Sequence, residues 1–419
     1  MDYARWTTLF KGKEARVTHL EELRQHRTEL LDFYQPRVCL PTGGYAYLDA
    51  EGSPLPEEGA QLWLNARMLH CFSIASMLGR PGAAQVAEHG MEHLYGGAGQ
   101  DAEHGGWFAV VGGATPSDNK ELYGQAHVLL AASSATLAGM DKGRALLADA
   151  LDVIDRHYWR EHDQRAVEAY DRSFAQLDEY RGQNANMHLT EAYIAAYEAT
   201  GNRELLDRAY GIAGHIAGRA AMSHEGSWRL PEHFDASWHV LWDFNRNDPR
   251  HPFRPFGSQP GHWLEWAKLL MQLSRHGFDD PWVLAAARNL FDGAFSDAWG
   301  EGGGFVYTVD WDGKPVVPER FFWEPAEGMG AAHLLWQHTR EERYAEAYET
   351  MWNYVVKHFV DHRYGSWFPE LDEQQRPVTH TWAGKPDLYH AFQATLYAEV
   401  SEPIGLALWA SRQAEARRR

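Results

Sequence analysis

Residues 259–270 read QPGHWLEWAKLL, a stretch that sets a helix start and fills its first turns with polar groups. Proline suits the first position of a helix, where its missing N–H costs nothing. His262 and Glu265 stand three residues apart and therefore share one face of the predicted helix. His188 and Glu191, in NANMHLTEAY, repeat this spacing near another predicted helix start. The repetition predicts a fold whose equivalent helices carry polar residues at equivalent ends.

Outward from this stretch, apolar residues spaced by three and four predict helices along most of the chain. The predicted ranges are 18–33, 57–79, 82–95, 119–139, 142–159, 185–200, 203–219, 261–275, 281–297, 325–339, 342–359 and 387–410. Breaks such as GRPG, GMDKG and TGNRE join neighbouring helices in antiparallel pairs. The segments GGWFAVV and GGGFVYTVDWDGKPV predict small β-hairpins in the connecting loops.

Every second predicted helix begins roughly 65 residues after the one before it, which is too long for the common short solenoid repeats. Six helical pairs at this spacing favour a closed ring of six inner and six outer helices, with an open solenoid as the alternative. The unusual polar residues fall on these alternate helices, mostly in their first turns: Arg67, Tyr123, His188, His262, Glu265, Glu327 and His390. If these helices form the inner ring, their starts converge on one pocket.

No strong domain boundary interrupts the pattern, so we expect one catalytic domain over residues 1–419. The longest irregular stretch, about 220–260, is expected to cover the pocket rather than to link domains.

The composition excludes several classes of partner. The chain carries 39 Lys and Arg against 58 Asp and Glu, a formal charge of −19, and it lacks a basic stripe, which argues against nucleic acid. Neither a signal-peptide core nor a membrane-spanning apolar run is evident. With two cysteines, a reducing cytoplasm is expected. We expect a small-molecule partner and a monomer or weak homo-oligomer.

Tryptophan and histidine are the informative bias, with 18 and 23 copies respectively. Much of this can be core filling between large helices. Aromatic faces beside His, Glu, Arg and Asn are also how proteins bind sugars, since the rings stack on C–H faces while polar groups take the hydroxyls.

His262 and His390 are the candidate proton carriers, because each follows a turn signal, opens an inner helix and titrates near neutrality. Glu265 and Glu327 are the candidate carboxylates, which can orient an imidazole or hold sugar hydroxyls. Glutamate in a first turn also simply complements the helix dipole. Two carboxylates across a pocket would equally suit glycoside hydrolysis.

A metal site is a further alternative. The two His-x-x-Glu pairs resemble half of a di-metal helix-bundle site, although such sites use Glu-x-x-His together with further glutamates. Neither an Asp-rich cluster nor a Cys-His grouping supports it, so we expect no metal and no cofactor.

Five motifs resemble the N-acylglucosamine 2-epimerase superfamily: LWLNARMLH, YRGQNANMHLTEAY, RPFGSQPGHWLEWAKLL, YTVDWDGKPVVPERFFWEPAEGMG and WAGKPDLYH. The resemblance runs from about residue 35 to 395 and is strongest to the aldose–ketose isomerases that act on mannose or sulfoquinovose. It implies an all-α (α/α)6 barrel that needs neither a metal nor a nucleotide.

The resemblance also implies residue roles. His262 and His390 match the acid/base pair that moves a proton between C1 and C2 of an open-chain sugar through a cis-enediol. The matching pocket residues are Arg67, Tyr123, Asn184, His188, Glu265 and Glu327, with Trp63 and Trp323 as aromatic walls. We expect His188 and Arg67 to donate hydrogen bonds to the enediol oxygens.

One departure from the family bears on the substrate. Pro252, Pro369 and Pro386 stand where sulfoquinovose isomerases carry polar groups, and proline offers no donor to a sulfonate. Isomerisation of mannose and fructose is therefore expected, and lyxose and xylulose are further candidates. The rivals are a sugar 2-epimerase on mannose, glucose or cellobiose, a sulfoquinovose isomerase, an inverting glycosidase with Glu327 as acid, and a sugar-binding barrel without activity.

Overall fold

The computed structural model describes residues 13–220, 228–386 and 388–419, where helices predominate and each strand has two or three residues. The α-helices are α1 (Lys13–Tyr34), α2 (Leu62–Met77), α3 (Ala83–Leu94), α4 (Leu122–Leu137), α5 (Gly143–Val153), α6 (Gln183–Thr200), α7 (Arg203–Ala213), α8 (Pro260–Arg275), α9 (Pro281–Ala298), α10 (Trp323–Thr339), α11 (Glu342–Tyr354), α12 (Tyr389–Ala394) and α13 (Leu406–Arg418).

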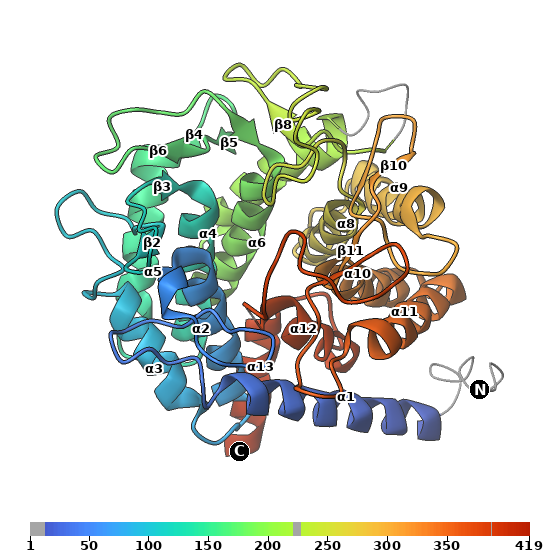
Figure 1. Cartoon of the computed structure of the whole chain (residues 1–419), viewed down its shortest axis with the longest axis horizontal. Helices are drawn as coiled ribbons and strands as arrows, with labels where there is room; N and C mark the ends of the chain where they lie inside the picture. Colours follow the sequence, from blue (N-terminus) through green and yellow to red (C-terminus); the bar gives the residue numbers. More distant parts are fainter. Residues whose placement is uncertain (1–12, 221–227, 387) are drawn as a thin grey trace.

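Six inner helices form a closed ring, seen end-on in Figure 1. Each even-numbered helix from α2 to α12 packs against the next, and α12 packs against α2. The outer helices α3, α5, α7, α9 and α11 each lie against the inner helix that precedes them. The expected (α/α)6 barrel is therefore confirmed, and the open solenoid is wrong.

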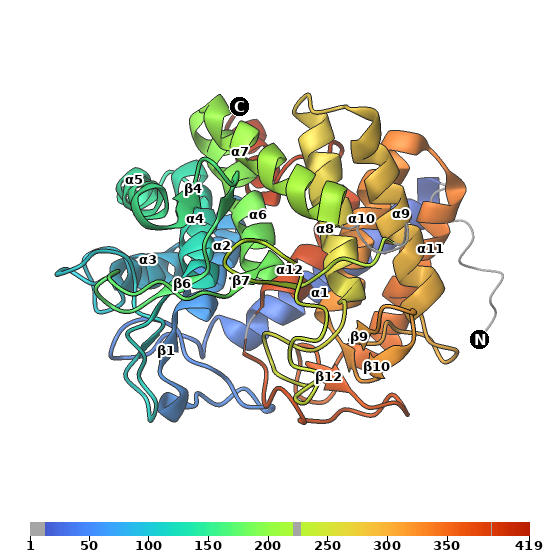
Figure 2. The same cartoon turned by 90° about the horizontal axis from the view of Figure 1, so that it is seen from above.

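The sixth inner–outer pair joins the two ends of the sequence, because α12 contacts α1. The remaining helix, α13, packs against α2, α4 and α6. Figure 2 shows most of the strands at one edge of the barrel and the C-terminus at the opposite edge. The strand-bearing end is the one at which the inner helices begin.

The two rings differ in their sequences for a physical reason. Inner helices contact protein on every side, so α4, LYGQAHVLLAASSATL, is buried over nearly its whole length and uses small residues where helices approach closely. Outer helices face solvent on one side. In α7 the buried residues recur at helical spacing, namely Leu205, Leu206, Ala209, Ile212 and Ala213. This amphipathic pattern made the outer helices readable from sequence.

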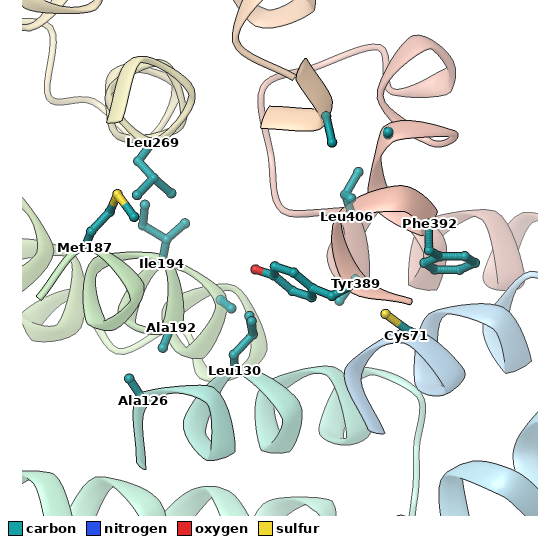
Figure 3. Close-up of a cluster of buried hydrophobic side chains, with 14 of the residues drawn as sticks. Cys71, Ala126, Leu130, Met187, Ala192, Ile194, Leu269, Tyr389, Phe392 and Leu406 are labelled. Carbon is teal, nitrogen blue, oxygen red and sulfur yellow. The ribbon is translucent and has the colours of Figure 1, made fainter. Parts of the chain in front are cut away.

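Apolar side chains fill the barrel between the inner helices and α13 (Figure 3). Met187 and Ile194 of α6 meet Leu269 of α8, and each of the three is almost fully buried. Cys71 of α2 is likewise fully buried. At roughly 1.5–3 kcal/mol for each large apolar side chain, this burial supports the ring without any disulfide.

Short antiparallel strands connect the segments that lead into successive inner helices. The paired strands are β1 (Ala60–Gln61) with β2 (Val110–Val111), β3 (Lys120–Glu121) with β6 (Ala169–Tyr170), β7 (Arg181–Gly182) with β8 (His233–Phe234), and β11 (Arg320–Phe321) with β12 (Glu370–Leu371). These pairs join α2 to α4, α4 to α6, α6 to α8 and α10 to α12.

Two further backbone links complete the circle. Ser258 and Val309 exchange hydrogen bonds of 2.9 Å and join α8 to α10, while Lys385 N donates to Leu48 O at 2.8 Å and joins α12 to α2. Within the described ranges, every neighbouring pair of inner-helix starts is thus linked. We call this hydrogen-bonded ring the collar.

The predicted hairpins are partly correct. GGGFVYTVDWDGKPV forms β9 (Thr308–Val309) and β10 (Pro315–Val317), which pair with each other. GGWFAVV also pairs locally, because Trp107 bridges Gln100 and Val110 bridges Ser117, and it contributes β2, which pairs with β1 about fifty residues earlier in the sequence. A local hairpin remains between β4 (Trp159–Arg160) and β5 (Arg165–Ala166).

The predicted helix 387–410 is wrong as a single element, and its first residue lies outside the described ranges. The chain forms α12, a 3-10 turn at Tyr397–Glu399 (η6), and then α13. Pro403 lacks an N–H and disfavours helical geometry at the residue before it, so SEPIG separates the two helices. Other predicted helix ends run into π-helical turns at Ile154–Tyr158 (η3), Gly214–Ala220 (η4) and Val355–Phe359 (η5). A 3-10 turn at Pro56–Glu58 (η2) precedes α2.

Candidate active site

A cavity of about 700 Å³, its open mouth included, lies at the collar end of the barrel where the inner helices begin. Its walls include nine of the ten predicted site residues: Trp63, Arg67, Tyr123, Asn184, His188, His262, Glu265, Trp323 and His390. The tenth, Glu327, lies behind His390. The structure therefore gathers the predicted residues into one pocket, as the helix-start pattern indicated.

His262 opens α8 and is held by a carboxylate that the sequence analysis missed. Its Nδ1 lies 2.9 Å from Glu232 Oε2, and Glu232 also accepts hydrogen bonds from Gln183 Nε2 and from the Gln259 backbone N–H. Burial raises the pKa of Glu232, but His262 and Gln183 together hold it below its ordinary value. An ionised carboxylate only accepts, so Glu232 favours the tautomer in which His262 donates through Nδ1, a nitrogen that also lies 2.7 Å from Gln183 Nε2.

His390 on α12 has the same arrangement with Glu327 of α10. His390 Nδ1 lies 2.7 Å from Glu327 Oε1, and the ammonium of Lys268 contacts the other carboxylate oxygen. Burial alone raises the pKa of Glu327, but Lys268 and His390 outweigh it and lower that pKa to about 2. His390 therefore also donates through Nδ1.

Trp323 lies close to both imidazoles. Its ring centroid is 5.3 Å from that of His262 and 6.0 Å from that of His390, with interplanar angles of 37° and 40°. A Cβ at Gly261 would come within 2.3 Å of the Trp323 ring, so the glycine of QPGH lets the indole lie against the first turn of α8. The motif thus serves the pocket as well as the helix start.

Arg67 forms part of the opposite wall. Its Nε donates to His127 Nε2 and its Nη2 donates to Tyr123 Oη, both at 2.9 Å, while the guanidinium carbon lies 4.7 Å from the Tyr389 ring centre. His127 Nδ1 donates to the Tyr123 carbonyl at 2.7 Å, so His127 is neutral. Burial and the charge of Arg67 keep the pKa of His127 well below its usual range.

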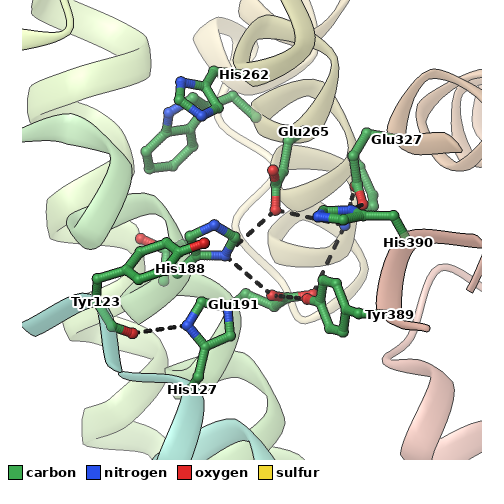
Figure 4. A network of polar contacts seen from close by, with 12 residues as sticks. Tyr123, His127, His188, Glu191, His262, Glu265, Glu327, Tyr389 and His390 are labelled. Atoms are coloured by element: carbon green, nitrogen blue, oxygen red, sulfur yellow. Dashed lines mark hydrogen bonds and ion pairs between the residues drawn. The ribbon is translucent and has the colours of Figure 1, made fainter. Parts of the chain in front are cut away.

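His188 and Glu265 present uncharged groups to the pocket. His188 Nδ1 lies 3.6 Å from Glu265 Oε1 and 3.7 Å from Glu191 Oε2 (Figure 4). Burial, reinforced by the negative charge of Glu327, raises the pKa of Glu265 well above 4.5, which favours the protonated, uncharged carboxyl. Burial and Arg67 lower the pKa of His188 well below 6.5. Both can therefore donate hydrogen bonds to substrate oxygens.

The two His-x-x-Glu pairs behave differently. His188 and Glu191 do approach each other on α6, but His262 turns to Glu232 while Glu265 turns to His188. The expected sharing of a helix face by His262 and Glu265 therefore does not make them partners. Glu232 and Glu327, which come from other segments of the chain, approach Nδ1 of His262 and His390 more closely, at 2.9 and 2.7 Å.

His188, Glu191 and Glu265 also have the mutual spacing of a cation site, with one potential ligand atom from each lying within 4.8 Å of the others. Their donor set, one imidazole and two carboxylates, fits a divalent ion. The ammonium of Lys268 already lies 3.8 Å from Glu191 and 4.0 Å from Glu265. A metal would have to compete with this resident positive charge.

The mouth of the pocket is aromatic and apolar. Phe253 lies edge-on to Trp382 at 5.1 Å and to Tyr123 at 5.8 Å. Pro252 and Phe253 line the wall and come from the irregular stretch expected to cover the pocket, although residues 221–227 of that stretch lie outside the described ranges. The other two prolines singled out by sequence, Pro369 and Pro386, line the same cavity.

Sequence reasoning missed Glu232, Gln183, His127 and Lys268. Glu232 lies in a segment without helical or strand periodicity, so only its position in space reveals it. Lys268 did carry a signal, because a lysine within the buried face of WLEWAKLL requires a buried partner.

Two imidazoles, each paired with a buried carboxylate, and several neutral or cationic donors can move protons on a polar small molecule. In the described part of the chain, none of the helices combines the length and the apolar character that a membrane span requires.

Comparison with known proteins agrees with this chemistry. Residues 43–394 match the family model for N-acylglucosamine 2-epimerase (GlcNAc 2-epimerase). A D-mannose isomerase from Thermobifida fusca is 43% identical over 387 residues, covering 91% of this chain and 94% of that protein. A crystal structure of D-mannose isomerase superposes with a TM-score of 0.85 at 33% identity, covering 90% of this chain and 97% of that one.

A cellobiose 2-epimerase from Spirochaeta thermophila shares the fold, with a TM-score of 0.75 at 22% identity, covering 95% of this chain and 99% of that one. With the family model spanning most of its length and the barrel closed in the same way, the chain belongs to the N-acylglucosamine 2-epimerase family.

Proposed function

We propose that this protein interconverts D-mannose and D-fructose by proton transfer within the pocket. The observation that carries the proposal is the pair of imidazole–carboxylate dyads, His262–Glu232 and His390–Glu327, whose two imidazoles line one cavity. The similarity to mannose isomerases supports mannose as the aldose. Lyxose and xylulose, which present the same C1–C3 arrangement, are further substrates under this proposal.

The steps follow from the donors and acceptors. One imidazole Nε2 removes the proton on C2 of the open-chain aldose, the C–H electrons form the C1–C2 double bond, and the carbonyl oxygen on C1 takes a proton. The resulting cis-enediol is held by donors from His188, Arg67 and the protonated Glu265. Protonation of C1 by the imidazolium and loss of the O2 proton then give the ketose.

A 2-epimerase reaction is the second candidate, and one observation favours it. The imidazoles of His262 and His390 come from different helices and both lie beside Trp323, so two separate proton carriers are available to one substrate carbon. Return of the proton to the opposite face of C2 would convert mannose to glucose. The proposed isomerase instead returns the proton to C1.

Hydrolysis with Glu327 as general acid is disfavoured. A general acid must carry a proton at working pH, whereas Lys268 and His390 keep the pKa of Glu327 at about 2. Glu327 is a hydrogen-bond acceptor for His390, and this role leaves it unable to protonate a leaving group.

The three prolines support a neutral substrate. A sulfonate spreads its charge over three oxygens and requires several donors, which the side chains of Pro252, Pro369 and Pro386 do not provide. A hydroxymethyl group needs only one or two hydrogen bonds. We therefore propose mannose over sulfoquinovose.

Metal independence is part of the proposal, because side-chain donors supply the stabilisation that a divalent ion would give the enediol. The cluster of His188, Glu191 and Glu265 already faces the ammonium of Lys268.

An NMR time course with mannose in heavy water tests the reaction class. Fructose carrying deuterium at C1 is expected. Glucose as the main product would establish the epimerase instead, and an unchanged mannose spectrum, with oligosaccharides cleaved in a parallel assay, would overturn the proposal in favour of a hydrolase.

A further inference from the structure

Lys268 is a buried cation that the proposed reaction steps do not use. It lies on α8 one turn beyond Glu265, and its side chain is 1% exposed. Its ammonium contacts Glu327 of α10 and lies 3.8 Å from Glu191 of α6 and 4.0 Å from Glu265. One lysine therefore faces three buried carboxylates from three inner helices.

The neighbouring helix leaves room for this side chain. A Cβ at Gly330 of α10 would lie 3.2 Å from Lys268 Cδ and 2.9 Å from the ring of Tyr397. Glycine within a helix costs roughly 0.5–1 kcal/mol relative to alanine. The glycine therefore stands where the aliphatic part of Lys268 and the ring of Tyr397 pack against α10.

The ammonium distributes charge unevenly among its three partners. Glu327 makes the direct contact and accepts the hydrogen bond from His390 Nδ1. Glu191 accepts a hydrogen bond of 2.5 Å from Tyr389 and lies at longer range from Lys268. Glu265 is the farthest of the three and its Oε1 accepts no hydrogen bond within the described part of the chain. Lys268 thus stabilises one negative charge directly beneath His390.

We propose that Lys268 is a positioning residue for proton transfer, which acts through Glu327 to hold His390 with Nδ1 donating and Nε2 facing the pocket. His262 has a different support, since its partner Glu232 is held by amides from Gln183 and Gln259. The two dyads therefore differ in net charge, and the Lys268 dyad carries one more positive charge. This inference rests on the proposed function.

Several other groups face Lys268 and share its field. Beside the three carboxylates these are Tyr397 of η6, whose Oη lies 3.4 Å from Nζ, and more distantly His70 of α2 and His188 of α6; Arg67 of α2 acts on the same Glu265. Once the ammonium is removed, Arg67 is the permanent cation that remains among these groups. The charge balance beneath His390 then shifts towards negative.

Lys268→Met tests the role, with Lys120→Met as the matched control. Lys120 is also fully buried and ion-paired, to Asp101 at 3.1 Å, but it contacts none of the carboxylates at the pocket. We expect Lys268→Met to lower kcat by roughly 10- to 100-fold, with a smaller change in KM. The acidic limb of the pH profile of kcat/KM should move to higher pH in this variant, because removal of the positive charge raises the pKa of the neighbouring groups. Lys120→Met should lower stability without moving that limb.

A double-variant cycle separates a positioning role from a purely structural one. If Lys268 acts through Glu327, adding Lys268→Met to Glu327→Gln should change kcat by less than threefold. If the two residues act independently, the fold-decreases in kcat of the two single variants should multiply in the double variant. Lys268→Gln, which keeps a donor without the charge, serves if the methionine variant does not fold.

Nitrogen-15 NMR of labelled histidines gives a readout without substrate, with the His390 signals assigned from a His390→Asn variant. The Nδ1-protonated tautomer of His390 is expected in the wild type and should be lost or mixed in Lys268→Met. The inference alone would be overturned if the wild type converts mannose but Lys268→Met keeps the same His390 tautomer, the same acidic limb and a kcat within threefold of the wild type. A wild type that leaves mannose unchanged would instead overturn the proposed function.

Discussion

Glu232→Gln is the sharpest test of the site, because sequence reasoning did not find this residue. The change keeps the shape of the side chain but removes the charge that accepts the Nδ1–H of His262 at 2.9 Å. A hydrogen bond to a charged group contributes about 1.5–3 kcal/mol. If that interaction holds the imidazole during proton transfer, its loss corresponds to a decrease of roughly 10- to 150-fold in kcat.

The assay measures fructose formation from mannose at several substrate concentrations. We expect kcat to fall and KM to change little, since Glu232 contacts the catalytic imidazole rather than lining the cavity. Glu198→Gln is the matched control, because Glu198 is also buried and binds an imidazole, His276, at 3.0 Å near the opposite end of α6. It should change stability but not kcat. A Glu232→Gln enzyme within threefold of the wild type would refute the assigned role of this dyad.

The remaining predictions concern the bases, the metal, the substrate and the pH dependence of stability. His262→Asn and His390→Asn should each lower turnover by roughly 10²–10⁴-fold with the circular dichroism spectrum retained, and near-normal turnover would remove that histidine from the mechanism. Dialysis against a strong chelator should leave activity unchanged, whereas loss of activity that Mn²⁺ restores would revive metal catalysis. In direct competition, mannose should have a higher kcat/KM than sulfoquinovose, and the reverse order would invalidate the proline argument. Burial lowers the pKa of His19, His70 and His93 from 6.5 to about 4. The unfolded chain therefore binds more protons than the folded chain between these two pH values, and the free energy of unfolding should fall as pH drops from 6.5 towards 4. Guanidinium unfolding curves with equal midpoints at pH 7 and pH 5 would contradict this.

The barrel was predictable from sequence because each outer helix has one apolar face and each break carries a turn signal. The last predicted helix was interrupted between Ala394, where α12 ends, and Leu406, where α13 begins; Pro403 lies within that break, although the helical apolar pattern continues on both sides of it. The collar was not predictable, because a two-residue strand such as β1 has too few residues to show a period. The strand with which β1 pairs is determined by the packing of the helices in the ring.

The candidate site divides in the same way. His262 and His390 could be found because turn signals place them at helix starts. The resemblance of the surrounding motifs to the N-acylglucosamine 2-epimerase superfamily supported the same two residues. Glu232 could not be found, because the backbone of an irregular segment brings it to His262 only after α6 and α8 have packed. The opposite pKa shifts of Glu265 and Glu327 also required the structure, since both are glutamates on inner helices and differ in their distance from Lys268 and in the hydrogen bond that Glu327 accepts from His390.

The collar has a consequence for the order of events during synthesis on the ribosome. Five of its six links join segments that leave the ribosome one after another, so they can form as the chain grows. The sixth, between Leu48 and Lys385, must wait until almost the whole chain has been made. Trp63 and His390 lie on opposite sides of that seam, so nascent chains should remain inactive until the seam closes. A circular permutant opened at another collar link would move the seam and let this part of the pocket assemble early.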